Sequence, residues 1–398
     1  MTTGRGSTME SAQAQSIHVS RPMLPTSDQL SPFLRNIDTT RFYSNGGNLH
    51  EMLQKALAGH FAIDPGRIGI AGSGTAALIG LLVAAAGRAK ADRPLCVCPA
   101  YTFVATASAA QACGYAPYLV DVDAQSWALD PVAVEALPDF AQVGAVILVA
   151  PYGRQIDLAG WRAFAQRTGV PVVIDAAASF DTFSAAEVIA SGLPVAISLH
   201  ATKTLSTAEG GLMICGDQAL IQRAVAAVNF GFVGERISVI PGINGKLSEY
   251  HAAVGLADLE TWPQKRAAFM MTASIYTMLA DFYLIGDRIE VNSDAAVPYA
   301  LFIAQDAAEA ERVGEALAAQ NIESRRWYGH GLQSHPAYAG CRRANLDTST
   351  DVAARVLGLP FSVDISARNV DRIIEEIART LGGVSRQSRR NLHHLPAQ

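Results

Sequence analysis

Short apolar runs that alternate with helical patterns dominate the chain between about residues 67 and 215. The runs contain few polar residues, so the strands that they predict are buried on both faces, as in a parallel sheet covered by helices. Helical patterns separate most of the runs, for example 75–86 closed by Gly87 and 158–167 closed by Gly169. The predicted strands are residues 68–71, 95–98, 115–120, 145–149, 172–174, 195–199 and 212–215. We therefore expect an α/β fold with a mostly parallel, doubly wound sheet.

The flanking segments predict a smaller second domain and two tails. Asn48 followed by Glu51 resembles a capping box, and apolar residues at helical spacing predict an amphipathic helix that starts there. Residues 256–271 predict a long connecting helix, which precedes a strand at 297–304 and helices at 307–319 and 370–381. The predicted units are a disordered N-terminus at 1–20, a large domain with an N-terminal arm at 21–265, a small C-terminal α/β domain at 266–383 and a disordered tail at 384–398.

Composition restricts the class of protein. Hydrophobic residues make up 50% of the 398 residues and charged residues 17%, which excludes a disordered chain. A net charge of −5 argues against a nucleic-acid partner, because phosphate binding needs a basic surface. The five cysteines contain no C-x-x-C pair, and neither a signal peptide nor an apolar stretch long enough for a membrane is visible. These features predict a reducing, cytoplasmic setting.

A glycine-rich turn lies between the first predicted strand and the helix after it. Its sequence is Ala71-Gly72-Ser73-Gly74-Thr75. Glycines let the backbone approach an anion, and a helix N-terminus offers N–H groups and a favourable dipole to a phosphate. The same sequence suits a tight turn in which Thr75 is an ordinary N-cap. The turn alone does not separate the two interpretations.

Three more side chains follow predicted strands, at the sheet edge where ligands of such folds bind. Asp175 is placed to pair with the pyridine nitrogen of pyridoxal phosphate (PLP), although a strand-end aspartate often only caps a loop. Lys203 lies where a partly desolvated amine acts as nucleophile and base, whereas most lysines are solvated surface charges. Phe103 is placed to stack on a flat cofactor ring, although most phenylalanines belong to a core. Each signal is weak alone, and their order makes them specific.

With these residues in place, the chain resembles the DegT/DnrJ/EryC1/StrS family of sugar aminotransferases, which are PLP enzymes of fold type I. The resemblance runs from about Tyr43 to Leu259. The matching motifs are SGTAAL at 73–78, PAYTFVAT at 99–106, VIDAA at 173–177, SLHATK at 198–203, EGG at 209–211, GINGKLSE at 242–249 and AAVGL at 252–256.

The resemblance implies a PLP site and assigns its residues. It implies that Lys203 forms the Schiff base with the cofactor, that Asp175 meets the pyridine nitrogen and that Phe103 stacks on the ring. The positions that match residues holding the phosphate are Gly74, Thr75 and Ser198.

The resemblance also implies a homodimer with shared sites. Asn244 matches an asparagine that reaches the phosphate from the neighbouring protomer. One position departs from the family, which usually has Gln or His three residues after the aspartate, in contact with the ring hydroxyl of the cofactor. Here Ala178 stands at that position, beside Ser179. The segment at 43–48 also departs, since it contains Gly46-Gly47-Asn48 where many members have a bulkier run.

The activity that the resemblance implies is transfer of an amino group, with glutamate as the expected donor, to a keto sugar attached to a nucleotide diphosphate. Alternatives within the fold are a PLP enzyme acting on a non-sugar ketone, a dehydratase and a non-catalytic regulator. Lys203 favours transamination, because members that lose this activity commonly replace the lysine. A nicotinamide-dependent dehydrogenase is a further alternative, since Gly72-x-Gly74-x-x-Ala77 imitates a dinucleotide fingerprint, but no acid follows the second predicted strand. Further candidates for substrate contacts are Arg236, Tyr328 and His330.

Overall fold

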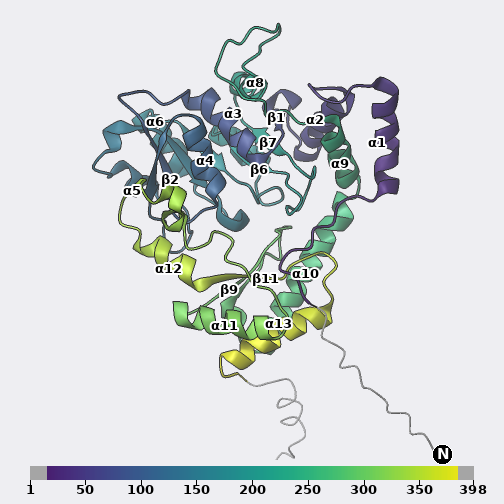
Figure 1. The fold of residues 1–398 in the computed structure, drawn as a ribbon, viewed down its shortest axis with the longest axis vertical. Helices are drawn as coiled ribbons and strands as arrows, with labels where there is room; N and C mark the ends of the chain where they lie inside the picture. The colour runs from purple at the N-terminus through teal and green to yellow at the C-terminus, as the bar shows by residue number, and fades with distance from the viewer. Residues whose placement is uncertain (1–15, 384–398) are drawn as a thin grey trace, which may run out of the picture.

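The fold is built on an eight-stranded sheet (Figure 1). In the computed structural model, which describes residues 16–383, the strand order is β1-β7-β6-β5-β4-β2-β3-β10. The strands from β6 to β10 in this order run parallel to one another, whereas β7 runs antiparallel to β6 and β1. Their bounds are β1 (Ile68–Ala71), β2 (Leu95–Pro99), β3 (Ala116–Val120), β4 (Val143–Val149), β5 (Val172–Asp175), β6 (Val195–Ser198), β7 (Gly211–Ile214) and β10 (Arg342–Arg343). The predicted mostly parallel sheet is confirmed, and all seven predicted strands are present.

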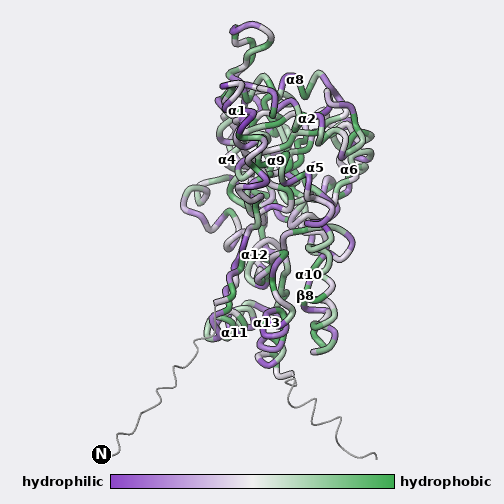
Figure 2. The backbone as a smooth tube through the Cα atoms, turned by 90° about the vertical axis from the view of Figure 1, so that its right-hand side faces the viewer, coloured by the Kyte–Doolittle hydropathy of each residue, from purple (hydrophilic) through white to green (hydrophobic). Residues whose placement is uncertain are grey.

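Helices cover both faces of the sheet, as the doubly wound prediction requires. One face carries α3 (Gly74–Ala86), α4 (Val104–Ala112) and α8 (Gln218–Ala227), which share a buried cluster with the strands. The other face carries α2 (Asn48–Phe61), α6 (Leu158–Thr168) and α7 (Ala185–Ser191), which belong to the larger core. Hydrophobic segments accordingly gather inside the upper part of the molecule (Figure 2). Because helices bury both faces of the sheet, the ends of its parallel strands meet at an edge that the helices leave open.

The N-terminus of α2 is capped differently from the prediction. Its N-cap is Gly47, which provides no side-chain hydrogen bond. Instead, the carboxylate of Glu249 accepts hydrogen bonds from Leu49 N at 2.7 Å and His50 N at 3.1 Å. A Cβ at position 47 would lie 2.7 Å from this carboxylate, so the close approach requires glycine. The predicted capping box at 48–51 is wrong, because a buried acid from a distant helix satisfies these N–H groups.

The predicted single helix at 256–271 is also wrong. The chain forms α9 (Glu249–Glu260) and α10 (Trp262–Phe282), separated at Thr261. Pro263 lies in the first turn of α10, where its missing N–H is tolerated, but its ring cannot continue the preceding helix. The predicted domain boundary near residue 265 falls inside α10, and the division of the chain at that residue stays a prediction. The structure also contains α1 (Ser27–Thr40), a helix that is not among the predicted elements.

A second, antiparallel sheet lies at the far end of α10 (Figure 1). Its order is β11-β9-β8, with β8 (Ile289–Glu290), β9 (Ala300–Ile303) and β11 (Val356–Leu359). The accompanying helices are α11 (Ala307–Ala319), α12 (Asp347–Arg355) and α13 (Ala367–Thr380). The predicted strand at 297–304 and the predicted helices at 307–319 and 370–381 are therefore present, with ends moved by up to three residues.

Part of the predicted N-terminal tail pairs with this smaller region. Ile17 forms a parallel bridge with Ile322, and Ser20 forms one with Phe361. Ile17 and Val19 are buried, so the alternating apolar side chains of this segment dock on the C-terminal part of the chain. The prediction of disorder is wrong for residues 16–20. The rest of the two predicted disordered ends, 1–15 and 384–398, lies outside the described residues.

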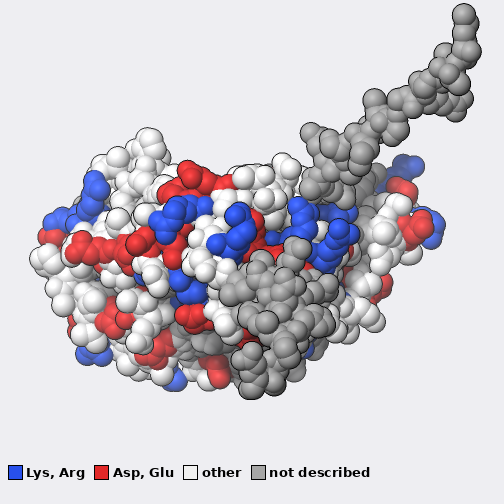
Figure 3. Space-filling model, turned by 90° about the horizontal axis from the view of Figure 1, so that it is seen from below, with Lys and Arg blue, Asp and Glu red and all other residues white. Residues whose placement is uncertain are grey.

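The described part of the chain contains no helix that is both long and apolar enough to cross a membrane. Figure 3 shows the lower face of the molecule, where basic and acidic side chains alternate. This face therefore does not present the uniformly basic surface that phosphate backbones need.

Candidate active site

Asp175 and Lys203, the two residues on which the sequence argument depended most, lie near each other at one edge of the main sheet. Asp175 is the last residue of β5, and Lys203 lies in the loop after β6, which pairs with β5 in parallel. Asp175 is buried, and this burial raises the pKa of its carboxyl group, while the positive charge of Lys203 acts in the opposite direction. The structure therefore brings a buried acid and a half-buried amine into electrostatic contact.

Two threonines hold Asp175 in place. Thr106 Oγ1 donates a hydrogen bond to Asp175 Oδ2 at 2.8 Å, and Thr106 in turn lies 3.0 Å from the hydroxyl of Thr102. Ala177 N donates to the other carboxylate oxygen at 3.3 Å. Sequence reasoning missed Thr106, although it lies three residues after Phe103, within the first turn of α4. Its role depends on contact with a strand 69 residues later.

The glycine-rich turn lies against the end of β6. Ser73 is the N-cap of α3, and its Oγ accepts a hydrogen bond from Ala76 N at 3.0 Å, so the alternative interpretation of Thr75 as the N-cap is wrong. A Cβ at Gly74 would lie 2.9 Å from Ser198 Cβ, and the two positions are therefore in direct contact. The structure thus brings Gly74, Thr75 and Ser198 together at the positive end of the α3 dipole.

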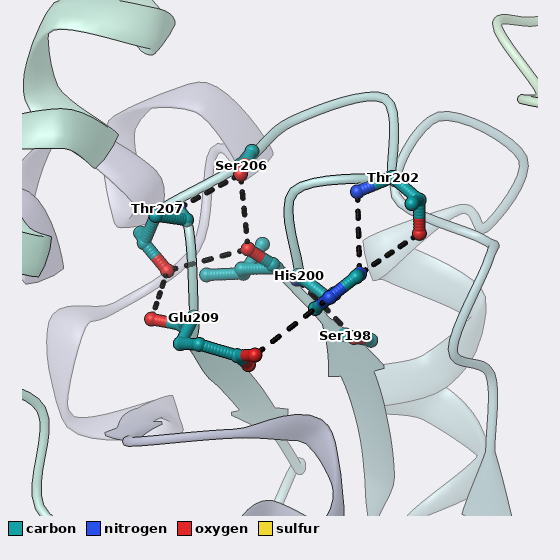
Figure 4. Close-up of polar contacts among 8 residues, drawn as sticks. Ser198, His200, Thr202, Ser206, Thr207 and Glu209 are labelled. Atoms are coloured by element: carbon teal, nitrogen blue, oxygen red, sulfur yellow. Dashed lines mark hydrogen bonds and ion pairs between the residues drawn. The ribbon is translucent and has the colours of Figure 1, made fainter. Parts of the chain in front are cut away.

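The loop that carries Lys203 is held by a dense set of polar contacts (Figure 4). Within it, His200 N donates to Ser198 Oγ at 3.3 Å, and Lys203 N donates to His200 O at 2.8 Å. Ser206 Oγ donates to Leu199 O, which closes the loop on itself. These contacts restrict the backbone on both sides of Lys203.

A buried ion pair between α9 and α10 also holds the loop that carries Lys203. Asp258 of α9 accepts a hydrogen bond from Ser206 N at 2.8 Å, and both oxygens of its carboxylate accept from Lys265 Nζ at 2.8 Å. The side chains of Asp258 and Lys265 are only 3% and 9% exposed. Burial raises the pKa of Asp258, and the charge of Lys265 opposes this shift. No sequence pattern indicates this arrangement, because the pair holds Ser206, which lies 52 residues before Asp258.

The other two predicted residues lie at the surface. Phe103 is the N-cap of α4 and is 56% exposed, so one face of its ring is open. Asn244 is exposed, and its side-chain oxygen accepts from Lys246 Nζ at 2.6 Å. The neighbouring Gly245 O accepts from Gly72 N at 2.6 Å, which places the Asn244 segment beside the glycine-rich turn.

A cluster of tyrosines that sequence reasoning largely missed surrounds the Lys203 amine. Lys203 Nζ donates a hydrogen bond to Tyr299 Oη at 2.9 Å. The Tyr299 ring meets the ring of Tyr152 edge to face at 5.2 Å, and Tyr152 stacks on Tyr328 at 4.6 Å. Tyr328 thus packs within this cluster. The other two residues considered for substrate contacts, Arg236 and His330, are exposed.

A cavity of about 330 Å³ opens beside this cluster. It is lined by Tyr152, Tyr299, Arg154 and Glu290, among other residues. Arg154 pairs with Glu290 and lies over the ring of Trp127 at 3.4 Å. The cavity therefore combines aromatic walls with a charged pair, as ligand sites commonly do, and shares Tyr299 with the surroundings of Lys203.

This geometry agrees with a known family. The sequence profile of the DegT/DnrJ/EryC1/StrS aminotransferase family matches residues 29–378. The chain belongs to this family. The resemblance noted in the sequence is confirmed, and the chain is an aminotransferase whose cofactor is pyridoxal phosphate. The alternative of a nicotinamide-dependent dehydrogenase is wrong, because the matched family transfers amino groups.

The matches to individual relatives span most of this chain and most of each relative. Protein Rv3402c of Mycobacterium tuberculosis is 28% identical over 372 residues, which cover 90% of this chain and 88% of the relative. The dTDP-4-amino-4,6-dideoxy-D-glucose transaminase of Shigella dysenteriae is 28% identical over 370 residues, or 91% and 98% of the two chains. The solved structure of DesI in the presence of its TDP-sugar product has a TM-score of 0.80 at 26% identity and covers 96% of each chain. The predicted fold type I is confirmed.

The described residues fit pyridoxal phosphate. Asp175 is a buried acid held by neutral donors, Thr106 and Ala177 N, so a protonated pyridine nitrogen would supply the positive charge that burial makes favourable. Glycine at position 74 lets the N-terminus of α3 pack closely against Ser198, which brings helix N–H groups and a hydroxyl together as a phosphate requires. Ser179 Oγ is buried without a hydrogen-bond partner among the described residues, which is a further polar atom available to a ligand.

Proposed function

We propose that this aminotransferase moves an amino group from glutamate to a keto group on a nucleotide-linked sugar, with pyridoxal phosphate bound through Lys203. The observation that carries the proposal is that the Lys203 amine and the buried Asp175 carboxylate lie at one sheet edge, near enough for the lysine charge to act on the acid. Two relatives support a nucleotide sugar as substrate. The transaminase of Shigella dysenteriae is named for a dTDP-linked sugar, and the DesI structure was solved in the presence of its TDP-sugar product.

Each residue of the site has a role that its surroundings support. Bound PLP supplies an aldehyde that captures amines and a ring that withdraws electrons from the substrate carbon. Asp175 holds a proton on the pyridine nitrogen, and Phe103 offers its open face to the ring. The phosphate is held by Gly74, Thr75 and Ser198. Lys203 Nζ would remove a proton from the substrate carbon and return it, since its amine lies at the sheet edge where Asp175 would hold the cofactor.

A homodimer completes the site in this proposal. Asn244 is exposed and bonded to Lys246, so its side chain is available at the surface to reach the phosphate of a partner subunit. Exposed apolar residues of the same part of the molecule support an interface there, because monomers rarely expose large apolar patches. They are Phe42, Tyr43, Phe230, Val233, Ile237, Val239 and Tyr250. We also place the reaction in the cytoplasm, as the sequence predicts.

A half-reaction screen tests the proposed function. Purified protein loaded with PLP should show a visible absorption band that glutamate converts to the pyridoxamine form. The pyridoxamine-loaded protein is then offered a panel of nucleotide-linked keto sugars and, as controls, an inosose and other non-sugar ketones. The proposal predicts that the visible band returns only with nucleotide-linked sugars. Return with the inosose alone, or a band that no amino donor changes, would contradict it.

A further inference from the structure

The hydroxyl of Tyr299 is a hydrogen-bond partner of the reactive amine that the predicted site does not contain. Lys203 Nζ donates to Tyr299 Oη at 2.9 Å, and Nζ lies 5.4 Å from the centre of the Tyr299 ring. Tyr299 immediately precedes β9, in the smaller sheet, and is 96 residues from Lys203. This bond therefore joins the smaller region of the chain directly to the atom that does the chemistry.

The ring of Tyr299 is fixed by its neighbours. It meets Tyr152 edge to face at 5.2 Å and Trp327 at 5.4 Å with an angle of 69°. Aromatic packing of this kind restricts the side chain to one rotamer, so its hydroxyl stays directed at Lys203. The contact is thus a feature of the packed protein and not of a freely rotating side chain.

The other hydroxyls of the cluster are engaged elsewhere. Tyr101 Oη and Tyr152 Oη bond to each other at 2.9 Å. Tyr328 Oη accepts from Tyr152 N at 3.3 Å. Tyr299 is therefore the member of the cluster whose hydroxyl serves Lys203.

Charged groups around the amine do not replace this partner. The carboxylate of Asp175 acts on Lys203 electrostatically from β5. A separate pocket is lined by Lys203 and Tyr299 together with Lys265 and Arg21. These two other cations are balanced by acids, since Lys265 pairs with Asp258 at 2.8 Å and Arg21 pairs with Asp364 at 3.3 Å. Tyr299 is accordingly the neutral side chain that forms a hydrogen bond with the Lys203 amine.

We propose that Tyr299 is a catalytic residue that stabilises the protonated form of the Lys203 amine. The inference rests on the proposed function of Lys203 as proton carrier. When Nζ takes a proton from the substrate carbon it becomes an ammonium, and the phenol oxygen accepts one of its hydrogens. When Nζ returns the proton, the phenol remains bonded to the neutral amine and keeps it in position.

The pH dependence of amine labelling in cofactor-free protein tests the proposal without measuring turnover. Wild type, Tyr299→Phe and a control, Tyr115→Phe, are treated briefly with acetic anhydride over a series of pH values, and the peptide containing Lys203 is quantified by mass spectrometry. Tyr115 is a suitable control because its hydroxyl bonds only weakly, at 3.4 Å, to carbonyls at the end of α3. The exposed Lys55 is the internal reference in each sample.

Loss of the phenol oxygen destabilises the ammonium, so the midpoint of Lys203 labelling in Tyr299→Phe should move to lower pH by about one unit. The midpoints for Tyr115→Phe and for Lys55 should not move. Coincident Lys203 midpoints in wild type and a folded Tyr299→Phe overturn the inference. If Tyr299→Phe does not fold, Tyr299→Leu provides the same comparison. Failure of wild-type Lys203 to form a borohydride-stable PLP adduct would instead contradict the proposed function itself.

Discussion

The loop at 199–209 and the loop at 229–241 are built in opposite ways. The first contains Leu205, Ser206 and Thr207 with no more than 1% of their surface exposed, and polar contacts tie it to itself and to α9. The second leaves the body of the molecule after α8 (Figures 1 and 2), and Val233 and Ile237 are 57% and 59% exposed.

The two loops suit two different requirements, which are a fixed position for the Lys203 amine and an apolar surface for association. Proton transfer needs an amine that stays within a fraction of an ångström of its working position, and the buried loop meets that need. An apolar loop projecting into solvent is costly for a monomer and useful to a dimer, since association buries it. The comparison predicts that changes in the first loop alter chemistry and stability, whereas changes in the second alter assembly.

The largest expected effect is that of Lys203→Ala. Because this change removes the proposed proton carrier and the proposed attachment point of the cofactor, turnover should fall by at least about 10²–10⁴-fold. Steady-state transamination assays measure the loss. Lys55→Ala, on the exposed surface of α2, is the matched control and should retain wild-type turnover. Comparable turnover in the two variants would refute the role of Lys203.

Asp258→Ala should destabilise the loop at 199–209, because it removes the acid of α9 that bonds to Ser206 N. The substitution leaves Lys265 charged, buried and unpaired, so the free energy of unfolding should fall by about 3–5 kcal/mol. Chemical denaturation measures this loss, and Glu51→Ala, which breaks the exposed pair of Glu51 with Lys55, should leave the free energy of unfolding nearly unchanged. The double variant Asp258→Ala/Lys265→Ala should recover part of the stability. A single variant as stable as wild type would show that the pair does not hold the loop.

The projecting loop should control assembly without affecting stability of the fold. Replacing Ile237 and Val239, both 59% exposed, with serine removes apolar area from the proposed interface. Each buried side chain of this type contributes about 1.5–3 kcal/mol, so the dimer dissociation constant should rise by about tenfold or more. Sedimentation velocity measures it. Serine at Met271 and Met278, on the distant exposed face of α10, is the control and should leave the constant unchanged. If both pairs of serine substitutions raised the dissociation constant equally, the projecting loop would have no particular role in assembly.

Asp175→Asn should produce a small change in the free energy of unfolding, and the sign of this change is informative. Burial raises the pKa of Asp175 above its ordinary value of 3.8, so the folded protein binds this proton more tightly than the unfolded chain. The stability that the acid contributes is complete below that value and is lost as the pH rises through the folded pKa. In cofactor-free protein the asparagine variant should therefore gain on the order of 1 kcal/mol at pH 8, with no gain near pH 4. Thermal unfolding at the two pH values measures this, and an equal effect at both would contradict the burial argument.

Residues whose role follows from local pattern were predictable from the sequence. The seven strands follow from apolar runs, and Asp175 and Lys203 were identified because they directly follow two of them. The break at Thr261 had a visible signal in Pro263, which the helical periodicity outweighed. Contacts between distant segments had no such signal. Glu249 caps a helix about 200 residues earlier, and Tyr299 reaches Lys203 across 96 residues, so both depend on the packing of the finished fold.

The attachment of the cofactor to Lys203 is the claim on which the account depends most. Protein incubated with PLP, reduced with borohydride and digested with trypsin should yield one modified peptide, with the adduct on Lys203. Adding glutamate before the borohydride should prevent this modification, since the amino donor releases the lysine. An adduct on other lysines with Lys203 unmodified, or no adduct at all, would contradict it.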